Sequence, residues 1–357
     1  MRTARRTLAG AALVLAGCVS PGGPILPTAS GRYETATDPA FLDAVERARV
    51  LLDRRDERAA LPCLQEALAA APDHVPTHIL YQDTALKLGG DDEAAMRAWY
   101  AALPDRPGSP VPLYCRARLA ADDHTRLALL EEALARDPSF YFAHLAVARI
   151  QRALGRLDAA QEALERALVA QPHHLESNLE MAQVLIDRGR YAQAEPYFAN
   201  YVAARPDDRL AAKAYAPLLL YRLHRVRQAQ PVLERLRSEN PEDPDVLMDL
   251  AAVAWEQDRF ADAIAAYHEV LRLDATATRA ALNLGNLHFE RGQRNADERP
   301  AAWSMARKAY RFYLSAARGA GLHDHLDALF AVPYRLELIA AEIGPDDGTP
   351  PAPGQNF

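Results

Sequence analysis

Residues 139–172 read SFYFAHLAVARIQRALGRLDAAQEALERALVAQP, and this stretch decides the fold. Apolar residues recur at helical spacing on both sides of Gly155, and small residues stand at Ala148 and Ala160. The pattern predicts two short helices joined by a turn at the glycine. Pro172 ends the second helix, because proline cannot continue the backbone hydrogen-bond ladder.

The same pattern returns at a fixed interval. Pro138, Pro172 and Pro206 are 34 residues apart, Pro241 follows after 35, and Ala275 takes the proline position 34 residues further on. A helix pair of this size cannot bury its own apolar face, so successive pairs must stack. Small residues would let the paired helices approach closely, and a large residue would fill the space opposite them.

A 34-residue period with two helices per unit resembles the tetratricopeptide repeat. The residues that carry the resemblance are Ala148, Gly155, Ala160, Leu164, Ala167 and Pro172 in one unit; Ala182, Gly189, Ala194, Phe198, Tyr201 and Pro206 in the next; and Ala251, Asp258, Ala263, Tyr267, Val270 and Ala275 in a later one. Residues 281–286 resemble the start of another first helix, with Gly292 at its turn. The resemblance implies an all-α solenoid, a right-handed superhelix of helix-turn-helix repeats.

The repeat pattern sets the expected boundaries. We expect seven or eight repeats over residues 39–321, with degenerate repeats over 73–138 and about nine residues inserted between Gln293 and Pro300. A final helix over 322–343, interrupted at Pro333, is expected to cap the open end of the solenoid. The Pro- and Gly-rich residues 344–357 are expected to form a disordered tail.

The N-terminus has the pattern of a secretory signal peptide over residues 1–17. Arg2, Arg5 and Arg6 precede a short apolar run that is too short to span a membrane. The run ends in Leu-Ala-Gly-Cys18, which resembles the lipobox of bacterial lipoproteins. The resemblance implies that Cys18 becomes the acylated first residue, with residues 18–38 as a flexible tether to the membrane. The alternative is an ordinary cleaved signal with a chance cysteine.

Composition narrows the classes of partner. The chain has 357 residues with 41 basic and 48 acidic side chains, and removal of residues 1–17 leaves 38 basic side chains. An acidic body argues against binding nucleic acid or an anionic membrane face. Cys63 and Cys115 fall on helices two repeats apart, so we expect free thiols rather than a disulfide.

No pattern predicts catalysis, a cofactor or a metal. His268 to Arg272 is one residue short of a zinc-protease motif, because Arg272 stands where the second histidine ligand would be. The His323–His325 and His173–His174 pairs have spacings that do not suit one metal site. The sequence holds no phosphate-binding glycine loop, Gly-x-Ser-x-Gly elbow or Cys-x-x-Cys motif. We therefore expect a protein that is not an enzyme.

The resemblance places the first helix of each repeat along a concave groove that binds an extended or helical peptide. The repeat register assigns to this groove Phe142, Leu145, Arg149, Leu179, Gln183, Ile186, Met248, Trp255, Leu282, Asn286 and Phe289. No lysine stands four residues before Asn286, so the clamp that some relatives use for a C-terminal carboxylate is not expected.

The predicted function is a lipid-anchored scaffold that binds another envelope protein. Val19 after the cysteine, rather than an aspartate, favours the periplasmic face of the outer membrane. Similar lipoproteins assist the assembly of outer-membrane machines such as the secretin pores of type IV and Tad/Flp pili. An adaptor for peptidoglycan hydrolases or synthases is the first alternative. An enzyme or sugar-binding module that uses the 293–300 insertion and the C-terminal cap is the second.

Overall fold

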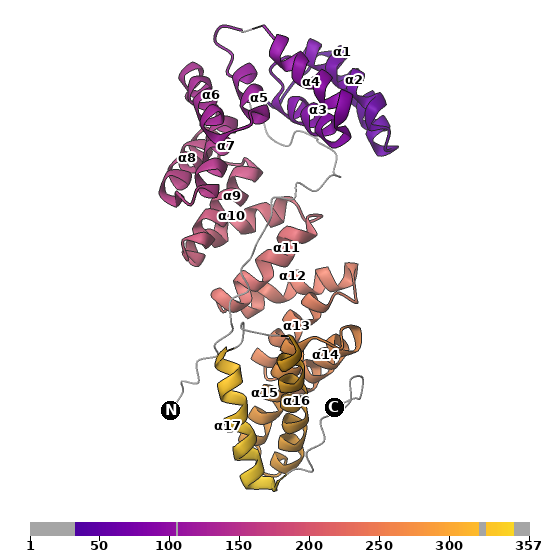
Figure 1. The fold of residues 1–357 in the computed structure, drawn as a ribbon, viewed down its shortest axis with the longest axis vertical. Helices are drawn as coiled ribbons and strands as arrows, with labels where there is room; N and C mark the ends of the chain where they lie inside the picture. Colours follow the sequence, from indigo (N-terminus) through magenta and orange to yellow (C-terminus); the bar gives the residue numbers. More distant parts are fainter. Residues whose placement is uncertain (1–32, 105, 321–325, 346–357) are drawn as a thin grey trace. The chain divides into compact units, whose positions relative to one another are not determined.

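The computed structural model describes residues 33–104, 106–320 and 326–345, and all of its regular elements are helices (Figure 1). The helices belong to two compact units that meet in sequence at Ala204 and Arg205. The signal peptide, Cys18, most of the predicted tether, His323, His325 and the tail from residue 346 lie outside the described residues. The predicted all-α fold of paired helices with an extra C-terminal helix is confirmed.

The N-terminal unit contains five helix pairs. They are α1 (Pro39–Asp53) with α2 (Glu57–Ala70), α3 (Val75–Leu88) with α4 (Gly90–Ala102), α5 (Val111–Leu119) with α6 (Asp123–Arg136), α7 (Tyr141–Ala153) with α8 (Leu157–Ala170), and α9 (Leu175–Asp187) with α10 (Tyr191–Ala204). Within this unit, the second helices α2, α4, α6 and α8 also pack against the first helix of the next pair. Residues 73–138, where the repeat pattern is weak, therefore still form two helix pairs.

The C-terminal unit contains three pairs and one further helix. They are α11 (Arg209–Pro217), continued by the π-helical turn η1 (Leu218–Arg222), with α12 (Val226–Glu239); α13 (Pro244–Glu256) with α14 (Phe260–Leu273); α15 (Thr278–Arg294) with α16 (Arg299–Ala320); and α17 (Leu326–Ile343). Helix α17 packs on α16 through the buried side chains of Val332 and Ile339, as a capping helix would. It runs through Pro333, where the sequence predicts an interruption.

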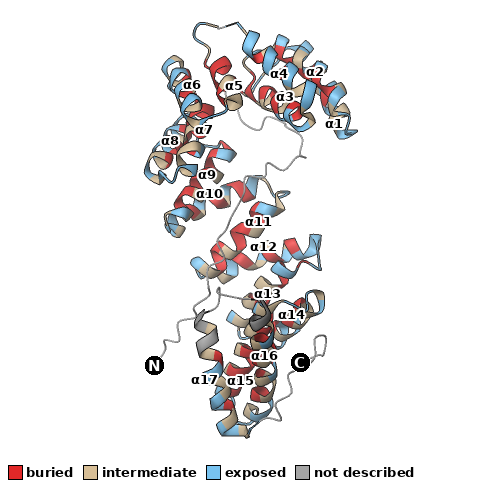
Figure 2. Ribbon diagram, in the orientation of Figure 1, coloured by how far each residue is buried: buried red, intermediate tan, exposed pale blue. Residues whose placement is uncertain are grey.

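The small residues of the repeat lie where paired helices touch. Ala148, Ala160 and Ala167 have no exposed surface, and Leu164 fills the space beside them. The turn between α7 and α8 uses a left-handed residue, Gly155, at φ 73°. Asp258 takes the same conformation at φ 59° and so confirms its assignment to the glycine position. Buried residues follow the inner sides of the pairs (Figure 2).

A second contact recurs at the start of three first helices, and the repeat pattern of the sequence does not predict it. The side chain six residues after the proline bonds to the proline carbonyl: His78 Nε2 to Pro72 at 3.0 Å, His144 Nε2 to Pro138 at 2.9 Å, and Asn178 Nδ2 to Pro172 at 3.1 Å. Because a carbonyl only accepts, each nitrogen carries the hydrogen. Neutral histidine and asparagine therefore serve the same purpose.

The region from 293 to 300 differs from its prediction. Helix α15 continues to Arg294, and only residues 295–298 separate it from α16, so the inserted residues mostly lengthen helices. Gly292 consequently lies inside α15 rather than at a turn. A Cβ atom there would come within 2.4 Å of Trp303 Cδ1, so the glycine permits the indole to pack against the helix backbone.

We expect the N-terminal unit to lose stability on acidification through its buried histidines. Burial lowers the pKa of His144, and lowers the pKa of His78 to about 4. The unfolded chain then binds more protons than the folded chain below pH 6.5, so stability falls as the pH drops from there toward 4. For His78 the full difference corresponds to about 3 kcal/mol.

His144→Asn isolates this effect, because asparagine makes the same bond at position 178. The variant should lose less thermal stability between pH 7.5 and pH 5 than the parent chain does. His124→Asn changes an exposed histidine and should leave the pH dependence as it was. Thermal stability is measured by circular dichroism melts. Equal losses of stability in the parent and the His144→Asn chains would contradict the assignment of this pH dependence to His144.

Candidate functional site

Polar side chains join consecutive first helices across the surface where these helices lie next to one another, which we call the first-helix face. Between α7 and α9, Arg152 donates to Glu180 at 3.1 Å, to Gln183 at 2.5 Å and to Asp187 at 2.7 Å. Arg149 Nε donates to the other oxygen of Glu180 at 3.3 Å. The Glu180 side chain is only 10% exposed, so these bonds satisfy a carboxylate that is largely removed from water.

The same kind of bond joins an earlier pair of first helices, α3 and α5. Arg118 of α5 donates to Gln82 Oε1 at 2.8 Å and to Asp83 Oδ1 at 2.7 Å, both on α3. The partners in these bonds are separated by 28 to 36 residues, close to one repeat length. Each bond therefore ties one repeat to the next.

The C-terminal unit continues the pattern with different residue types. Lys213 Nζ lies 3.0 Å from both Asp243 oxygens, and Trp255 Nε1 donates to Glu290 at 2.8 Å. Tyr221 of η1 donates to Asp249 at 2.6 Å. Burial raises the pKa of the Asp249 carboxyl group to about 6.

The last first helix, α15, bonds to the cap. Asn286 Oδ1 accepts from Tyr310 Oη at 2.9 Å and also from Arg335 of α17. The Arg335 guanidinium lies 5.5 Å from the centre of the Phe289 ring, and that ring stacks on Trp303 at 5.1 Å. Helix α17 thus contributes a cation to the first-helix face of the last repeat.

The structure divides the eleven predicted groove residues between the two units. Phe142, Leu145 and Phe289 are more than nine-tenths buried and belong to the cores of their units. Arg149 is exposed, and seven side chains are partly exposed: Leu179, Gln183, Ile186, Met248, Trp255, Leu282 and Asn286. Arg149, Gln183 and Trp255 take part in the bonds between repeats, and Asn286 bonds to Tyr310 and to Arg335 of the cap. The binding role of all eleven stays a prediction.

The N-terminal segment before α1 is a feature that the sequence reasoning missed. Tyr33, placed by sequence in a flexible tether, is only 5% exposed, and its ring meets Phe140 at a centroid distance of 4.8 Å. The Tyr33 carbonyl accepts from Val75 N at 2.9 Å, and the Glu34 carbonyl bonds to His74 Nε2 at 2.9 Å. A tyrosine in a Pro-, Gly-, Ser- and Thr-rich stretch was the available signal.

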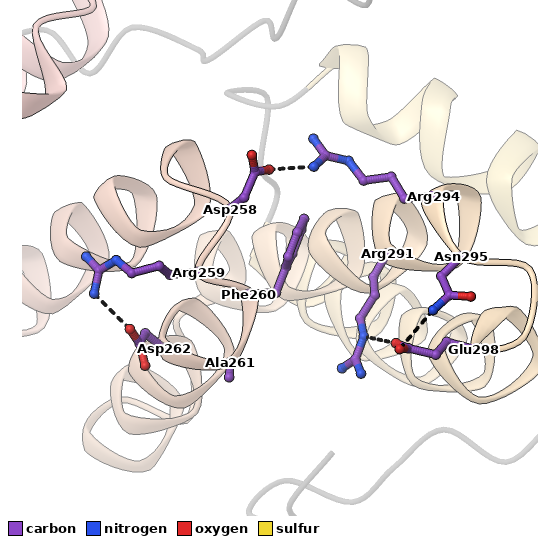
Figure 3. Close-up of a pocket in the computed structure, with 9 residues that line it drawn as sticks. All are labelled: Asp258, Arg259, Phe260, Ala261, Asp262, Arg291, Arg294, Asn295 and Glu298. Carbon is purple, nitrogen blue, oxygen red and sulfur yellow. Dashed lines mark hydrogen bonds and ion pairs between the residues drawn. The ribbon is translucent and has the colours of Figure 1, made fainter.

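A shallow surface hollow of about 570 Å³ lies at the turn between α13 and α14 and the end of α15 (Figure 3). Its polar side chains are bonded to one another: Arg259 to Asp262 at 2.8 Å, Asn295 to Glu298 at 3.0 Å, and Arg294 to Asp258. The Arg294 guanidinium also lies 5.2 Å from the centre of the Phe260 ring. These pairings leave the hollow without the converging free polar groups that an active site needs.

Other predicted chemistry can be placed within the described part of the chain. Arg272, in the near-match to the zinc-protease motif, pairs with Glu269 at 2.7 Å. His174 is buried and bonds to Ser177, whereas His173 is exposed. Among the described residues, no three His, Cys, Asp or Glu side chains are grouped to hold a metal ion. Cys63 and Cys115 are both free thiols, as predicted.

No helix in the described ranges combines the length and the apolar character needed to cross a membrane.

Two family models of the tetratricopeptide repeat match the sequence, one over residues 119–253 and one over residues 249–313. The chain is a tetratricopeptide repeat protein. Neither matching model is that of an enzyme family. No curated protein sequence matches the chain.

Solved structures of other repeat proteins are similar to parts of this one. YrrB, described as a TPR protein with an unusual peptide-binding site, has 15% identity and a TM-score of 0.46 over 57% of this chain and 96% of its own. MamA from Desulfovibrio magneticus RS-1 has 17% identity and a TM-score of 0.44 over 50% of this chain and 96% of its own. A tetratricopeptide repeat protein from Parabacteroides merdae ATCC 43184 has 16% identity and a TM-score of 0.37 over 66% of this chain and 94% of its own.

The bonds of Arg152 should contribute to the stability of the N-terminal unit. Arg152→Ala leaves the largely buried Glu180 with fewer donors and should lower the free energy of unfolding by about 1–3 kcal/mol. Arg166→Ala removes an exposed ion pair within α8 and should cost no more than about 0.5 kcal/mol. The free energies are measured by urea unfolding. Equal unfolding midpoints for the two variants would show that the Arg152 bonds add no more stability than the exposed Arg166–Glu162 ion pair does.

Proposed function

We propose that this protein is a lipid-anchored scaffold on the periplasmic face of the outer membrane. It is held there by acyl chains on Cys18 and binds another envelope protein through the first-helix face. The bound protein belongs to an outer-membrane complex of the pilus or secretion type, which the scaffold helps to assemble. The observation that carries the binding proposal is the set of partly exposed apolar side chains on the first-helix face.

In the N-terminal unit these apolar side chains come from α9. They are Leu179 and Ile186, and the polar Gln183 between them lies four and three residues away, so all three share one side of the helix. The neighbouring charges of Arg152, Glu180 and Asp187 are already paired within the chain. A partner therefore meets apolar surface flanked by neutralised charge, and burial of apolar groups would supply most of the affinity.

In the C-terminal unit Met248 and Trp255 stand seven residues apart on α13 and are both partly exposed. A tryptophan held by one hydrogen bond, here from Nε1 to Glu290, offers a large rigid surface at little entropic cost. Trp255 is therefore the strongest candidate for an anchor that a partner would cover.

Capture of the partner in cells tests the proposed face. The tagged full-length chain is crosslinked in its native host, and the proteins recovered with it are compared among variants. Leu179→Ala and Trp255→Ala should each reduce recovery of the partner about tenfold or more, the size typical of an interface hot spot. Val169→Ala, at an 84% exposed position on the second helix α8, should not reduce it.

The identity of the captured protein decides between the proposed role and its alternative. Secretin or pilus components that depend on Trp255 would support the assembly role. Peptidoglycan hydrolases or synthases would instead make the protein a cell-wall adaptor. Recovery that is the same for all three variants, with helicity unchanged, would contradict the first-helix face as the binding surface.

The anchor makes a separate prediction. Cys18→Ala removes the thiol that the lipobox resemblance marks for acylation, so the chain should move from the membrane fraction to the soluble or unprocessed fraction. Cys63→Ala alters a partly buried thiol in the repeats and should leave fractionation unchanged. A Cys18→Ala chain that stays with the membrane after a carbonate wash would rule out the anchor.

A further inference from the structure

Residues 33–35 belong to no helix, yet they contact the beginnings of three first helices in the N-terminal unit. Their partners are His74 and His174, which directly precede α3 and α9, and Asp137 in the turn between α6 and α7, about 40 to 140 residues further along the chain. We call these residues the strap. They engage a helical surface in the way that a short bound peptide would.

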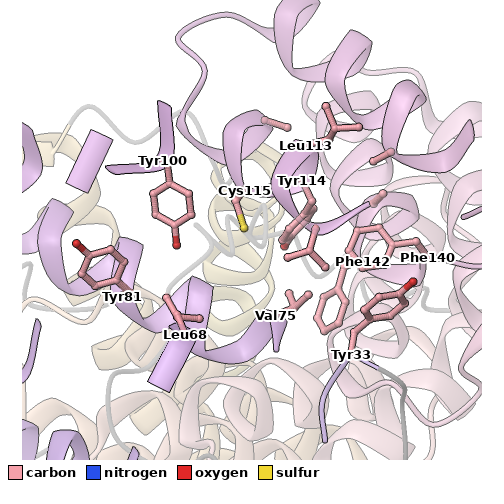
Figure 4. Close-up of a cluster of buried hydrophobic side chains, with 14 of the residues drawn as sticks. Tyr33, Leu68, Val75, Tyr81, Tyr100, Leu113, Tyr114, Cys115, Phe140 and Phe142 are labelled. Atoms are coloured by element: carbon pink, nitrogen blue, oxygen red, sulfur yellow. The ribbon is translucent and has the colours of Figure 1, made fainter. Parts of the chain in front are cut away.

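The ring, the hydroxyl and the backbone carbonyl of Tyr33 in the strap all make contacts. Its ring packs edge-on against Phe140 at 4.8 Å, with Val75 close by (Figure 4). Its hydroxyl donates to Asp137 Oδ2, and its carbonyl accepts from the Val75 amide at 2.9 Å. This pocket recognises a phenol and its backbone, not just an apolar side chain.

Glu34 lies between two buried histidines, His74 and His174, which precede α3 and α9 at matching repeat positions. A hydroxyl three residues later orients each ring: Thr77 Oγ1 is 2.8 Å from His74 Nδ1, and Ser177 Oγ is 2.8 Å from His174 Nδ1. Because His74 Nδ1 also accepts from the Thr77 amide, its Nε2 carries the hydrogen that the Glu34 carbonyl accepts.

The second histidine faces the acidic side chain. His174 Nε2 lies 3.8 Å from Glu34 Oε1, and both side chains are largely buried, at 6% and 13% exposure. The carboxylate of Glu176 lies 3.2 Å from the same ring nitrogen. The Nε2 atom of His74 thus faces the carbonyl of Glu34, and the Nε2 atom of His174, at the matching repeat position, faces the carboxylate of Glu34.

We infer that these groups form a recognition site for a short peptide with tyrosine followed by an acidic residue, and that the chain's own Tyr33–Glu34 occupies it as a displaceable strap. The partner is a protein that carries the same Tyr–Glu pair. The inference goes beyond the proposed scaffold role, since it names a site and a ligand sequence and does not depend on Cys18.

Tethering explains why the site is filled in the isolated chain. A segment joined to its site by a short connection has an effective concentration of about a millimolar. A free peptide must exceed that concentration to displace the strap. Vacating the site should therefore raise the affinity for an added peptide by about 100-fold or more.

The test uses a fluorescent peptide of residues 30–38, SGRYETATD, and the purified full-length chain in detergent. Tyr33→Ala/Glu34→Ala should bind the peptide about 100-fold more tightly than the parent chain does, as measured by anisotropy. Asp137→Ala added to this variant should weaken binding about tenfold, and a peptide with alanine at both positions should not bind. The matched control Tyr334→Ala/Glu337→Ala changes an exposed tyrosine and glutamate of α17 and should behave like the parent chain.

Two results would overturn the inference. One is a strap variant of unchanged helicity that binds the peptide no better than the parent chain. The other is a parent chain that forms dimers which the strap variant loses, because the segment would then be exchanged between copies. If the variant does not fold, amide hydrogen exchange of the parent chain provides the test. Millimolar peptide should speed amide exchange at residues 33–36. Unchanged exchange would rule out displacement of the strap.

Discussion

The close approach of paired helices is the constraint on which the rest of this structure depends. Ala148, Ala160 and Ala167 leave no room for anything but a neighbouring helix, and each pair is left with an apolar side that only another pair can cover. The left-handed turn at Gly155 and the proline after the second helix fix the direction in which the next pair can be added. Stacking is therefore a consequence of the local sequence.

Stacking brings together the side chains of consecutive first helices, and the polar bonds of the first-helix face follow from it. Arg152, Lys213 and Trp255 differ in chemistry, but each bonds to a residue of the following repeat, and Asn286 bonds to Arg335 of the cap. Their bonds satisfy charges that stacking has partly removed from water. The same surface keeps partly exposed apolar groups between these bonds, and these are the groups that the proposed partner would cover.

The strap shows a second use of the repeat geometry. Matching positions at the starts of α3 and α9 hold His74 and His174, and the stacked repeats aim both at one residue of a segment that has no regular structure. A site of this kind needs no change in the fold. It needs only two suitable residues at one repeat position and a peptide that reaches them.

The sequence by itself determined the helix pairs and their period, because these depend on spacing within about 40 residues. The repeat register assigned the polar residues Arg149, Gln183 and Asn286 to the groove, but it could not name Glu180, Arg152 and Arg335 as their bonding partners. It placed Phe142, Leu145 and Phe289 in a groove, whereas stacking buries them. Only the tertiary structure decided these points and the place of Tyr33, because burial and bonding there are set by residues a full repeat or more away in the chain.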